Sequence, residues 1–370
     1  MLSGDDHHWM ADALRLAAAV FPPPHPNPRV GCVLVRDGEL VGRGAHHRAG
    51  GPHAEVEAIR DAGGAARGST AYVTLEPCAH HGRTPPCVEA LVEAGVVRVV
   101  AALRDPNPRV AGGGLERLAA AGIEVVDGLM SAEAAGQNRG FLQRMSHGRP
   151  WVTVKLAASL DGRTAMESGE SRWITSAAAR RDVHRRRAAA SAVLTGSGTV
   201  LADDPRLTAR DLEIPLPDAR QPGRVVLDSR LRTPPSAALL AEPGPVLVFH
   251  VAGDSARRDA LVEWGAEVVA LPSAGGGIDL DAALRALAER EVNDLFVEAG
   301  PTLAGALTRA GLADELLIYL APHLMGDAAR PLMRLPGIET MDQRLPVSVT
   351  DVRRLGDALR ITAAPMPVPE

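Results

Sequence analysis

The sequence predicts an α/β protein with two domains, and three observations support this. The chain has 370 residues, which suits more than one domain. Hydrophobic residues form 46% of it and aromatic residues only 3%, so the cores must consist mostly of Ala, Leu and Val. Strand-like runs alternate with segments of helical spacing, which is typical of helices packed on a sheet. The pattern breaks at residues 141–151, so we expect domains at 1–147 and 148–370.

The first domain is expected to begin with a helix that starts at Asp5 or Asp6. Strands are predicted from their composition and from the turn or proline that ends them, at residues 29–38, 69–77 and 97–105, and the first of them ends in a hairpin turn at Asp37-Gly38. Helices are predicted from their spacing of apolar residues, at residues 53–63, 86–96 and 114–122.

The second domain shows strand-like runs with helical segments between several of them. The runs are WVTVKLAASL, SAVLTGSGTV, RVVLDS, PVLVFH, AEVVAL and DLFVEAG, and a last strand, ALRITAAP, closes the chain. The proline-rich segment 211–223 is expected to be an exposed loop. No G-x-G-x-x-G motif follows a strand, so the usual dinucleotide-binding fingerprint is absent.

Charge and cysteine usage limit the class of protein. The net charge of −5 is spread over both halves and gives no basic footprint for nucleic acid and no polybasic membrane patch. The longest apolar runs, such as LLIYLAPHLM at residues 316–325, are too short to span a bilayer. Acidic residues stand near the N-terminus, where a signal peptide needs basic ones, so we expect a cytoplasmic protein. Three cysteines cannot form a disulfide framework, and two nearby cysteines in a reducing compartment are often metal ligands.

Two segments together predict a catalytic zinc site. PHAEVEAI contains His53 and Glu55, and LEPCAHHGRTPPCVEAL contains Cys78 and Cys87. One imidazole and two thiolates suit Zn²⁺, which keeps its fourth position for water when it is catalytic. Glu55 stands at the start of a predicted helix, where it can take a proton from that water and give it to a leaving nitrogen. We therefore predict His53, Cys78 and Cys87 as ligands and Glu55 as the proton shuttle.

The order of these residues follows the pattern H-x-E and P-C-x-x-C of zinc nucleobase deaminases, except in one spacing. Here eight residues, AHHGRTPP, separate the cysteines. A His-x-Glu pair alone is usually only a helix start, and two cysteines alone are often core residues. The zinc site is therefore predicted from the presence of both features in one chain, not from either of them alone. Cys32 is expected in the core of a strand. His80 and His81 are competing ligands, although a substrate contact is the better interpretation for them.

The segments NPRVGCVLV, HAEVEAI and EPCAHHGRTPPC resemble the deaminase half of the bifunctional deaminase/reductase family of riboflavin biosynthesis. The resemblance implies a cytidine-deaminase-like three-layer domain. It also implies hydrolytic removal of an exocyclic amine from a diaminopyrimidinone that carries a ribosylamino phosphate. Asn27, in HPNPRVG, matches a position that holds the pyrimidine in related deaminases, and a simple turn before a proline is the alternative.

Two segments of the second half each allow two interpretations when they are considered without any family resemblance. In VEAGPTLAGAL, a strand, a turn and a helix are predicted, and free N–H groups from Gly300 to Ala304 could seat a phosphate. Most such turns, however, only reverse the chain. The run RRDVHRRR, residues 180–187, is usually a solvated helix face, and the alternative is one inward arginine that grips a phosphate.

The segments VTVKLAASLDGRTA, GESRWIT, TGSGTVLADDPRLTAR and VEAGPTLAGAL resemble the reductase half of the same family. The resemblance implies a dihydrofolate-reductase-like domain that uses NADPH to reduce the ribosyl group to a ribityl chain. It implies cofactor contacts at Ala157, Trp173, Thr199, Asp203, Ser229, Gly300, Pro301, Thr302, Leu303, Ala304, Gly305 and Ala306. It implies substrate contacts at Ser171, Arg187, Leu207, Arg210 and Glu298. The opened sugar must also be protonated, and the ionisable candidates, which the sequence does not rank, are Lys155, Asp203 and Glu298.

The leading hypothesis is therefore a bifunctional enzyme that acts on a small phosphorylated pyrimidine, with Zn²⁺ and NADPH as cofactors. No nucleic acid or membrane partner is expected, and family members are oligomeric, so we expect a homo-oligomer. One alternative is a zinc deaminase for guanine or tRNA adenine, fused to a non-catalytic nucleotide-binding domain. Another is a non-catalytic module with structural zinc, but such sites usually have four protein ligands.

Overall fold

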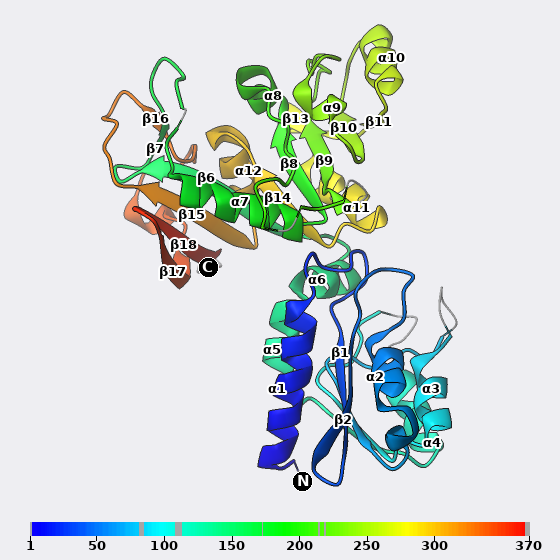
Figure 1. Ribbon diagram of the computed structural model, residues 1–370. Coiled ribbons are helices and arrows are strands. Elements are labelled where there is room, and N and C mark those ends of the chain that lie inside the picture. The colour runs from blue at the N-terminus through cyan, green and yellow to red at the C-terminus, as the bar shows by residue number, and fades with distance from the viewer. Residues whose placement is uncertain are drawn as a thin grey trace. The chain divides into compact units, whose positions relative to one another are not determined.

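The computed structural model describes residues 2–80, 85–107, 113–171, 173–213, 215–217 and 220–366. The chain divides into two compact units, Met1–Arg149 and Pro150–Glu370 (Figure 1). The predicted boundary lies two residues earlier. Within the described part of the chain, no helix is both long enough and apolar enough to cross a membrane.

The N-terminal unit is built on a five-stranded sheet with the strand order β2-β1-β3-β4-β5. β1 is antiparallel to both β2 and β3, while β3, β4 and β5 run parallel. The predicted hairpin turn lies between β1 and β2, where Asp37 and Gly38 both have positive φ angles, as a tight two-residue hairpin requires. The strands are β1 (Gly31–Arg36), β2 (Glu39–Ala45), β3 (Thr70–Val73), β4 (Arg98–Ala101) and β5 (Glu124–Asp127).

Helices cover both faces of this sheet, so the unit has three layers. Figure 1 shows α1 on one side of β1 and α2 on the other. Alternate residues of β1 supply the two cores: Val33 packs with α1, whereas Cys32 is fully buried against α2, as predicted. The helices are α1 (Gly4–Ala19), α2 (Ala54–Ala62), α3 (Cys87–Ala94), α4 (Gly113–Ala120), α5 (Ser131–Gln137) and α6 (Arg139–His147), and a 3₁₀ turn, η1 (Gly63–Ala66), follows α2.

The start of α1 differs from the prediction. Ser3 is the N-cap, and Asp6 lies three residues inside the helix, where its carboxylate accepts a hydrogen bond from the Ser3 N–H at 2.8 Å. The Ser3 hydroxyl accepts one from the Asp6 N–H in return, at 3.1 Å. This reciprocal capping box places the acidic residue in the first turn rather than at its start.

The C-terminal unit is built on a nine-stranded sheet with the order β11-β10-β9-β8-β14-β6-β15-β18-β17. The first seven strands in that order are parallel, and β18 and β17 are antiparallel. β15 and β17 were not predicted. The strands are β6 (Trp151–Ser159), β8 (Ala192–Gly196), β9 (Gly223–Leu227), β10 (Val246–His250), β11 (Ala266–Ala270), β14 (Asp294–Glu298), β15 (Glu315–Ala321), β17 (Val347–Leu355) and β18 (Ala358–Pro365).

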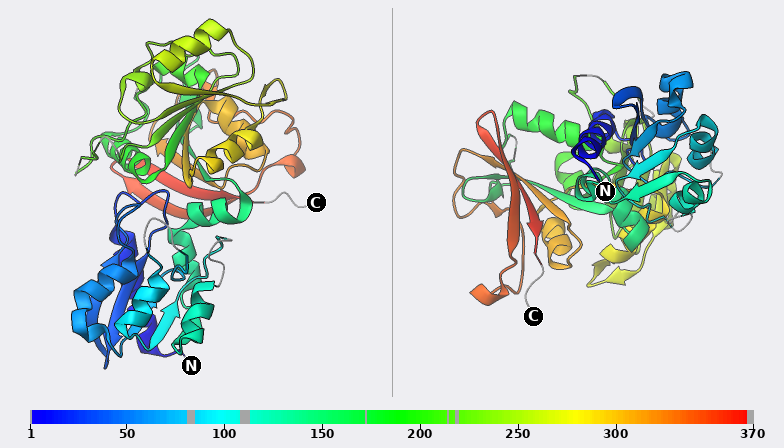
Figure 2. Two further views of the ribbon diagram at one scale, coloured as in Figure 1. Left: turned by 90° about the vertical axis from the view of Figure 1, so that its right-hand side faces the viewer. Right: turned by 90° about the horizontal axis from the view of Figure 1, so that it is seen from below.

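Helices lie on both faces of the larger sheet as well (Figure 2). One face packs Leu284 and Leu307 of two helices on Val154 and Val297, and the other packs Val183 on Leu317. The helices are α7 (Ala177–Ala189), α8 (Ser197–Asp203), α9 (Ala238–Ala241), α10 (Ser255–Glu263), α11 (Leu280–Glu289) and α12 (Pro301–Arg309). Short strand pairs, β7 (Arg163–Ala165) with β16 (Arg330–Pro331) and β12 (Ser273–Ala274) with β13 (Gly277–Ile278), complete the unit.

Parallel strands place their carboxyl ends at one edge of a sheet, and ligands bind at that edge in open α/β folds. β6, β8, β9 and β14 are neighbours or near neighbours in the larger sheet, so the residues that follow them gather there. The proline-rich loop predicted at 211–223 is exposed or half-buried at most of its described positions.

Candidate active sites

Three side chains of the N-terminal unit form a cluster suited to a metal ion. The ligand atoms of His53, Cys78 and Cys87 all lie within 4.8 Å of one another. Nδ1 of His53 is 3.1 Å from Sγ of Cys87 and 3.5 Å from Sγ of Cys78, and the two sulfurs are 3.5 Å apart. His80 is not part of this group, and His81 lies outside the described residues.

The cluster is held by the starts of two helices. His53 is the N-cap of α2, and Cys87 is the first residue of α3. The backbone N–H of Cys87 donates to Sγ of Cys78 at 3.3 Å, and the N–H of Val88 donates to the Cys78 carbonyl at 3.3 Å. On β2, a Cβ at Gly44 would lie 2.2 Å from the carbonyl oxygen of Ala54, so only glycine lets α2 approach this closely.

The donor set fits a tetrahedral zinc ion. With bonds of about 2.0–2.3 Å, ligand atoms on such an ion are ~3.6–3.8 Å apart, which is within about half an ångström of the observed spacing. The neighbouring Cys87 thiol and His53 outweigh burial and lower the pKa of Cys78 well below its ordinary value. A sulfur that is already a thiolate is the form that binds a cation.

Glu55 follows His53 at the start of α2 and is buried, with 3% of its surface exposed. Burial raises its pKa to about 7, while the charge of His53 opposes this rise and that of Cys78 adds to it. A carboxyl group whose pKa lies near neutrality can both accept and release a proton, which is the property that acid–base catalysis needs.

Asn27 is joined to the cluster through His46, which the sequence analysis did not single out. Nδ1 of His46 donates to the Pro52 carbonyl at 2.9 Å, so its Nε2 accepts a hydrogen bond from the Asn27 amide at 3.0 Å. The His46 ring packs edge-on against the His53 ring with 5.1 Å between centroids. Asn27 is thereby brought close to the cluster.

Glu76 is a second residue that the motif search missed, although it precedes Pro77-Cys78. Its carboxylate is buried and accepts backbone N–H groups from Gly114 at 2.9 Å, Leu115 at 3.2 Å and Asp105 at 3.1 Å. A negative charge at the N-terminus of α4 is favourable because of the helix dipole. Glu76 therefore ties the strand that leads to Cys78 to α4 and to the loop after β4.

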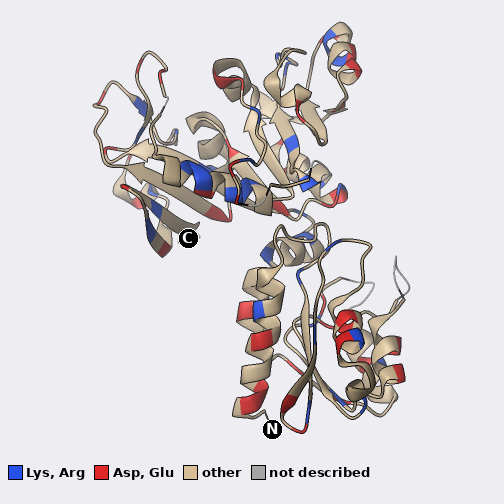
Figure 3. Ribbon diagram, viewed as in Figure 1, with Lys and Arg blue, Asp and Glu red and all other residues tan. Residues whose placement is uncertain are grey.

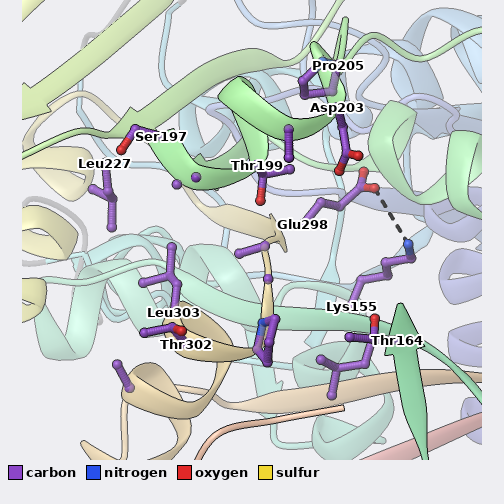
Figure 4. A pocket seen from close by; sticks show the side chains of 18 of the residues that line it. Lys155, Thr164, Ser197, Thr199, Asp203, Pro205, Leu227, Glu298, Thr302 and Leu303 are labelled. Carbon is purple, nitrogen blue, oxygen red and sulfur yellow. Dashed lines mark ion pairs between the residues drawn. The ribbon is translucent and has the colours of Figure 1, made fainter. Parts of the chain in front are cut away.

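The C-terminal unit contains a cavity of about 1800 Å³ at the carboxyl edge of its sheet. The predicted residues that line it are Lys155, Ala157, Ser171, Trp173, Arg187, Thr199, Asp203, Leu207, Arg210, Ser229, Glu298, Gly300, Pro301, Thr302, Leu303 and Ala306. Figure 4 shows Lys155, Asp203 and Glu298 together at one end and Ser197 and Leu227 at the other.

Ala304 and Gly305 do not line the cavity. Ala304 is fully buried, and a Cβ at Gly305 would lie 1.9 Å from the carbonyl oxygen of Arg334, so this glycine allows α12 to pack closely on its neighbour. Gly300 is the N-cap and Pro301 the first residue of α12, which places the start of that helix at the cavity. The N–H groups of a first helical turn are a favourable seat for phosphate.

Glu298, at the end of β14, is the centre of the charged end of the cavity. Arg187 of α7 grips its carboxylate with two nitrogens, Nε and Nη2, and Nζ of Lys155 lies 3.9 Å from Oε2. Burial raises the pKa of Glu298, but the charges of Arg187 and Lys155 prevail and lower it to about 2. Glu298 is therefore ionised at neutral pH. Figure 3 shows the basic residues that gather along α7.

Lys155 is the single lysine among the 40 Lys and Arg residues of the sequence. It lies on β6, and burial lowers its pKa although the charge of Glu298 opposes this. Arginine cannot release a proton under ordinary conditions, whereas a buried lysine can. Lys155 can therefore lose its proton more readily than an arginine at the same position could.

His184 also lines this end, and the sequence analysis passed over it within the arginine run. Its Nδ1 accepts the backbone N–H of Arg210 at 3.4 Å, and Nε2 lies 3.6 Å from the Asp211 carboxylate. Burial, together with the charges of Arg187 and Arg210, lowers its pKa to about 4. His184 is therefore neutral near pH 7 and supports the loop that carries Leu207 and Arg210.

Comparison with known proteins agrees with these two sites. Residues 3–103 match the family of the cytidine and deoxycytidylate deaminase zinc-binding region, and residues 150–360 match the RibD C-terminal domain. The riboflavin biosynthesis protein RibD of Escherichia coli (strain K12) is 52% identical over 361 residues, which cover 95% of this chain and 97% of that protein.

Solved structures show the same arrangement within each unit. Acinetobacter baumannii RibD, form 1, has a TM-score of 0.92 at 46% identity and covers 98% of this chain and 99% of its own. The diaminohydroxyphosphoribosylaminopyrimidine deaminase/5-amino-6-(5-phosphoribosylamino)uracil reductase of Thermotoga maritima has a TM-score of 0.84 at 32% identity and covers 98% and 99%.

The folds and sites thus define a two-domain enzyme that joins a zinc-binding deaminase to a pyrimidine reductase. The N-terminal domain is cytidine-deaminase-like and the C-terminal domain dihydrofolate-reductase-like, which confirms the predicted fold class. The chain belongs to the RibD family of bifunctional deaminase/reductases in riboflavin biosynthesis. Its cofactors are zinc and NADPH, as predicted, and the alternative of a non-catalytic second domain is not retained.

Proposed function

We propose that the N-terminal unit hydrolyses the exocyclic amine of a diaminopyrimidinone ribosylamino phosphate at the cluster of His53, Cys78 and Cys87. A zinc ion held by these three side chains supplies an activated water as nucleophile. The observation that carries this proposal is the convergence of one imidazole and two sulfurs within 4.8 Å. Among the residues that the structure describes, no fourth ligand joins this group, which is the arrangement of catalytic rather than structural zinc sites.

Glu55 is the proposed proton shuttle of this half-reaction. It takes a proton from the attacking water and delivers a proton to the departing nitrogen, so that water and the amine become a carbonyl group and ammonia. A pKa of about 7 supports this role, because both protonation states are then populated near neutral pH. Asn27, fixed by His46, is proposed to bind the pyrimidine beside the cluster.

The C-terminal unit is proposed to reduce the ribosyl group of the deaminated product to a ribityl chain. NADPH supplies the hydride, and the protein must place the sugar and provide a proton to the opened sugar. Lys155 is the proposed proton donor among the three candidates. Glu298 is ionised and paired with Arg187, so it acts as an anchor for Lys155 rather than as an acid.

The experiment that tests both assignments is incubation of the full-length protein with the diaminopyrimidinone ribosylamino phosphate, followed by mass analysis. Without NADPH we expect a product in which an amino group is replaced by oxygen. With NADPH we expect the same product with two additional hydrogens. A chain with Cys87→Ser that still released ammonia at the normal rate would reject the cluster as the deaminating site.

A further inference from the structure

We propose that Asn138 is a positioning residue of the deaminase, which fixes the segment that carries Asn27 beside the metal cluster. This inference rests on the proposed function of the N-terminal unit, in which Asn27 binds the pyrimidine. Asn138 lies between α5 and α6, and only 5% of its surface is exposed. Its side chain contacts a residue that lies 109 positions earlier in the chain.

The amide of Asn138 forms two hydrogen bonds with the backbone of a single residue, Arg29. Its Oδ1 accepts the N–H of Arg29 at 2.8 Å, and its Nδ2 donates to the Arg29 carbonyl at 2.9 Å. Residues 28–30 directly precede β1 and belong to no strand or helix. A side-chain amide offers the same donor and acceptor as a peptide group. Asn138 therefore takes the place that a neighbouring strand would have beside Arg29.

Asn138 makes this contact instead of the one that its position in the helix favours. It is the N-cap of α6, where asparagine is preferred because its side chain can accept an N–H of the first helical turn. Its side chain forms no such capping bond. The backbone on either side is held separately, since the N–H of Asn138 donates to the Ala135 carbonyl at 3.0 Å and its carbonyl accepts the N–H of Leu142 at 2.9 Å. The side chain is thus available for Arg29.

The segment around Arg29 is also anchored on two other elements near the metal cluster. The N–H of His46, after β2, donates to the Val30 carbonyl at 2.9 Å, while the His46 ring accepts the Asn27 amide at 3.0 Å. Thr74, after β3, donates its N–H to the Gly31 carbonyl, and its Oγ1 accepts the Gly31 N–H, both at 3.1 Å. Asn138 supplies both backbone bonds of the residue that lies between Asn27 and Val30.

Loss of the Asn138 amide would leave the N–H and carbonyl of Arg29 without these partners. Partly buried polar groups without a hydrogen bond are unfavourable, so the segment would shift until water reaches them. Asn27 lies two residues away, and a displacement of about 1 Å in a group that places the substrate can cost roughly 100-fold in rate. Asn138 should therefore affect deamination through Asn27 and not through the metal ligands.

The test is a double-mutant cycle on deamination by the full-length, zinc-loaded protein. Asn138→Ala should lower kcat/KM for the diaminopyrimidinone ribosylamino phosphate by roughly 10- to 100-fold, mainly through a higher KM. Zinc content should stay near one ion per chain, and the reductase rate with the deaminated substrate should not change. In a chain that already carries Asn27→Ala, the same substitution should have little further effect, because both residues act through one contact.

Gln137→Ala is the matched control, because Gln137 is the adjacent residue and its Nε2 donates to the Leu14 carbonyl of α1 at 3.1 Å. The control also loses a hydrogen bond to a distant part of the chain, but this bond does not reach the segment of Asn27. It should lower the free energy of unfolding of the N-terminal unit and leave KM unchanged.

Effects of Asn138→Ala and Asn27→Ala that simply add, or an equal rise of KM in Gln137→Ala, would show that Asn138 is only structural and would overturn the proposal. Unchanged deamination by Asn27→Ala alone would instead overturn the proposed role of Asn27, and the role of Asn138 with it. Asn138→Ser, which keeps a smaller polar group at this position, is the second variant if the alanine protein does not fold. It should show the same rise of KM and the same lack of additivity.

Discussion

His46 and Asn27, which are 19 residues apart in the sequence, meet through a hydrogen bond of 3.0 Å between the Asn27 amide and Nε2 of His46. Because the opposite ring nitrogen is bound to the Pro52 carbonyl, the histidine presents an acceptor to Asn27 in one fixed orientation. The pKa of His46 is lowered by burial, so the neutral ring that this arrangement requires is favoured.

His46→Ala should lower kcat/KM of deamination by roughly 10- to 100-fold, because Asn27 loses the partner that orients it. The reductase rate, measured with the deaminated substrate, should not change. His47→Ala is the control, since His47 is exposed beside the same strand. An unchanged deamination rate in His46→Ala would show that Asn27 does not depend on this contact.

Glu76→Gln should weaken zinc retention. The amide replaces one accepting oxygen by a donor that faces backbone N–H groups, and an unsatisfied buried group of this kind costs about 1–3 kcal/mol. We expect faster transfer of zinc to a chelator and a lower free energy of unfolding of the N-terminal unit. Glu93→Gln, at an exposed position of α3, should leave both quantities unchanged.

We expect the N-terminal unit to lose stability in acid, because Arg98 and Tyr72 stabilise the ionised carboxylate of Asp6. The hydrogen bond from Arg98 is the main reason that the pKa of Asp6 lies well below its ordinary value, and Tyr72 donates a further hydrogen bond at 2.8 Å. A lowered pKa in the folded state means that the carboxylate stabilises the fold above its unfolded pKa. This contribution is lost as the pH falls from about 4 through the folded pKa.

The measurement is denaturant unfolding of the unmodified protein and of Asp6→Asn at several pH values. At pH 6 the variant should be less stable, and the difference should shrink steadily below pH ~4. A difference that stays constant down to pH 2 would contradict the assignment of this carboxylate. Asp5→Asn provides the control, because Asp5 is exposed in the same helical turn.

Lys155→Met should reduce the rate of the reductase by roughly 10²- to 10⁴-fold, the usual contribution of a general acid, and leave NADPH bound. In the unmodified protein the rate should fall as the pH rises through the pKa of Lys155, which burial places below the ordinary value of 10.5. Because Lys155 is the single lysine, ¹⁵N-lysine labelling gives one Nζ signal that reports this titration directly. A midpoint at or above 10.5 would contradict the proposal.

Much of the fold could be predicted because its signals are local. Alternating strands and helices, the Asp37-Gly38 turn and the helix starts at His53 and Cys87 follow from neighbours in the sequence. β17 escaped prediction because it is largely exposed and has no apolar run, and β15 was noticed only as an apolar run. Ser3 was missed as the N-cap because its partner Asp6 is itself a common capping residue.

The site residues also fall into those that a local pattern predicts and those that it does not. His53, Glu55, Cys78 and Cys87 could be proposed from motif order, since each ligand type is chemically distinctive. His46 and Glu76 could not, because their roles depend on contacts with residues that lie 19 to 38 positions away. Such contacts carry no local pattern, and only the folded chain shows them.

The most direct test of the central claim is ammonia release by Glu55→Gln, measured together with its zinc content. We expect ammonia release to fall by roughly 10²- to 10⁴-fold while zinc stays near one ion per chain. Glu57→Gln, two residues further along α2, where the carboxylate pairs with Arg60 at 3.1 Å, should remain active. Normal ammonia release by a zinc-loaded Glu55→Gln protein would contradict the account.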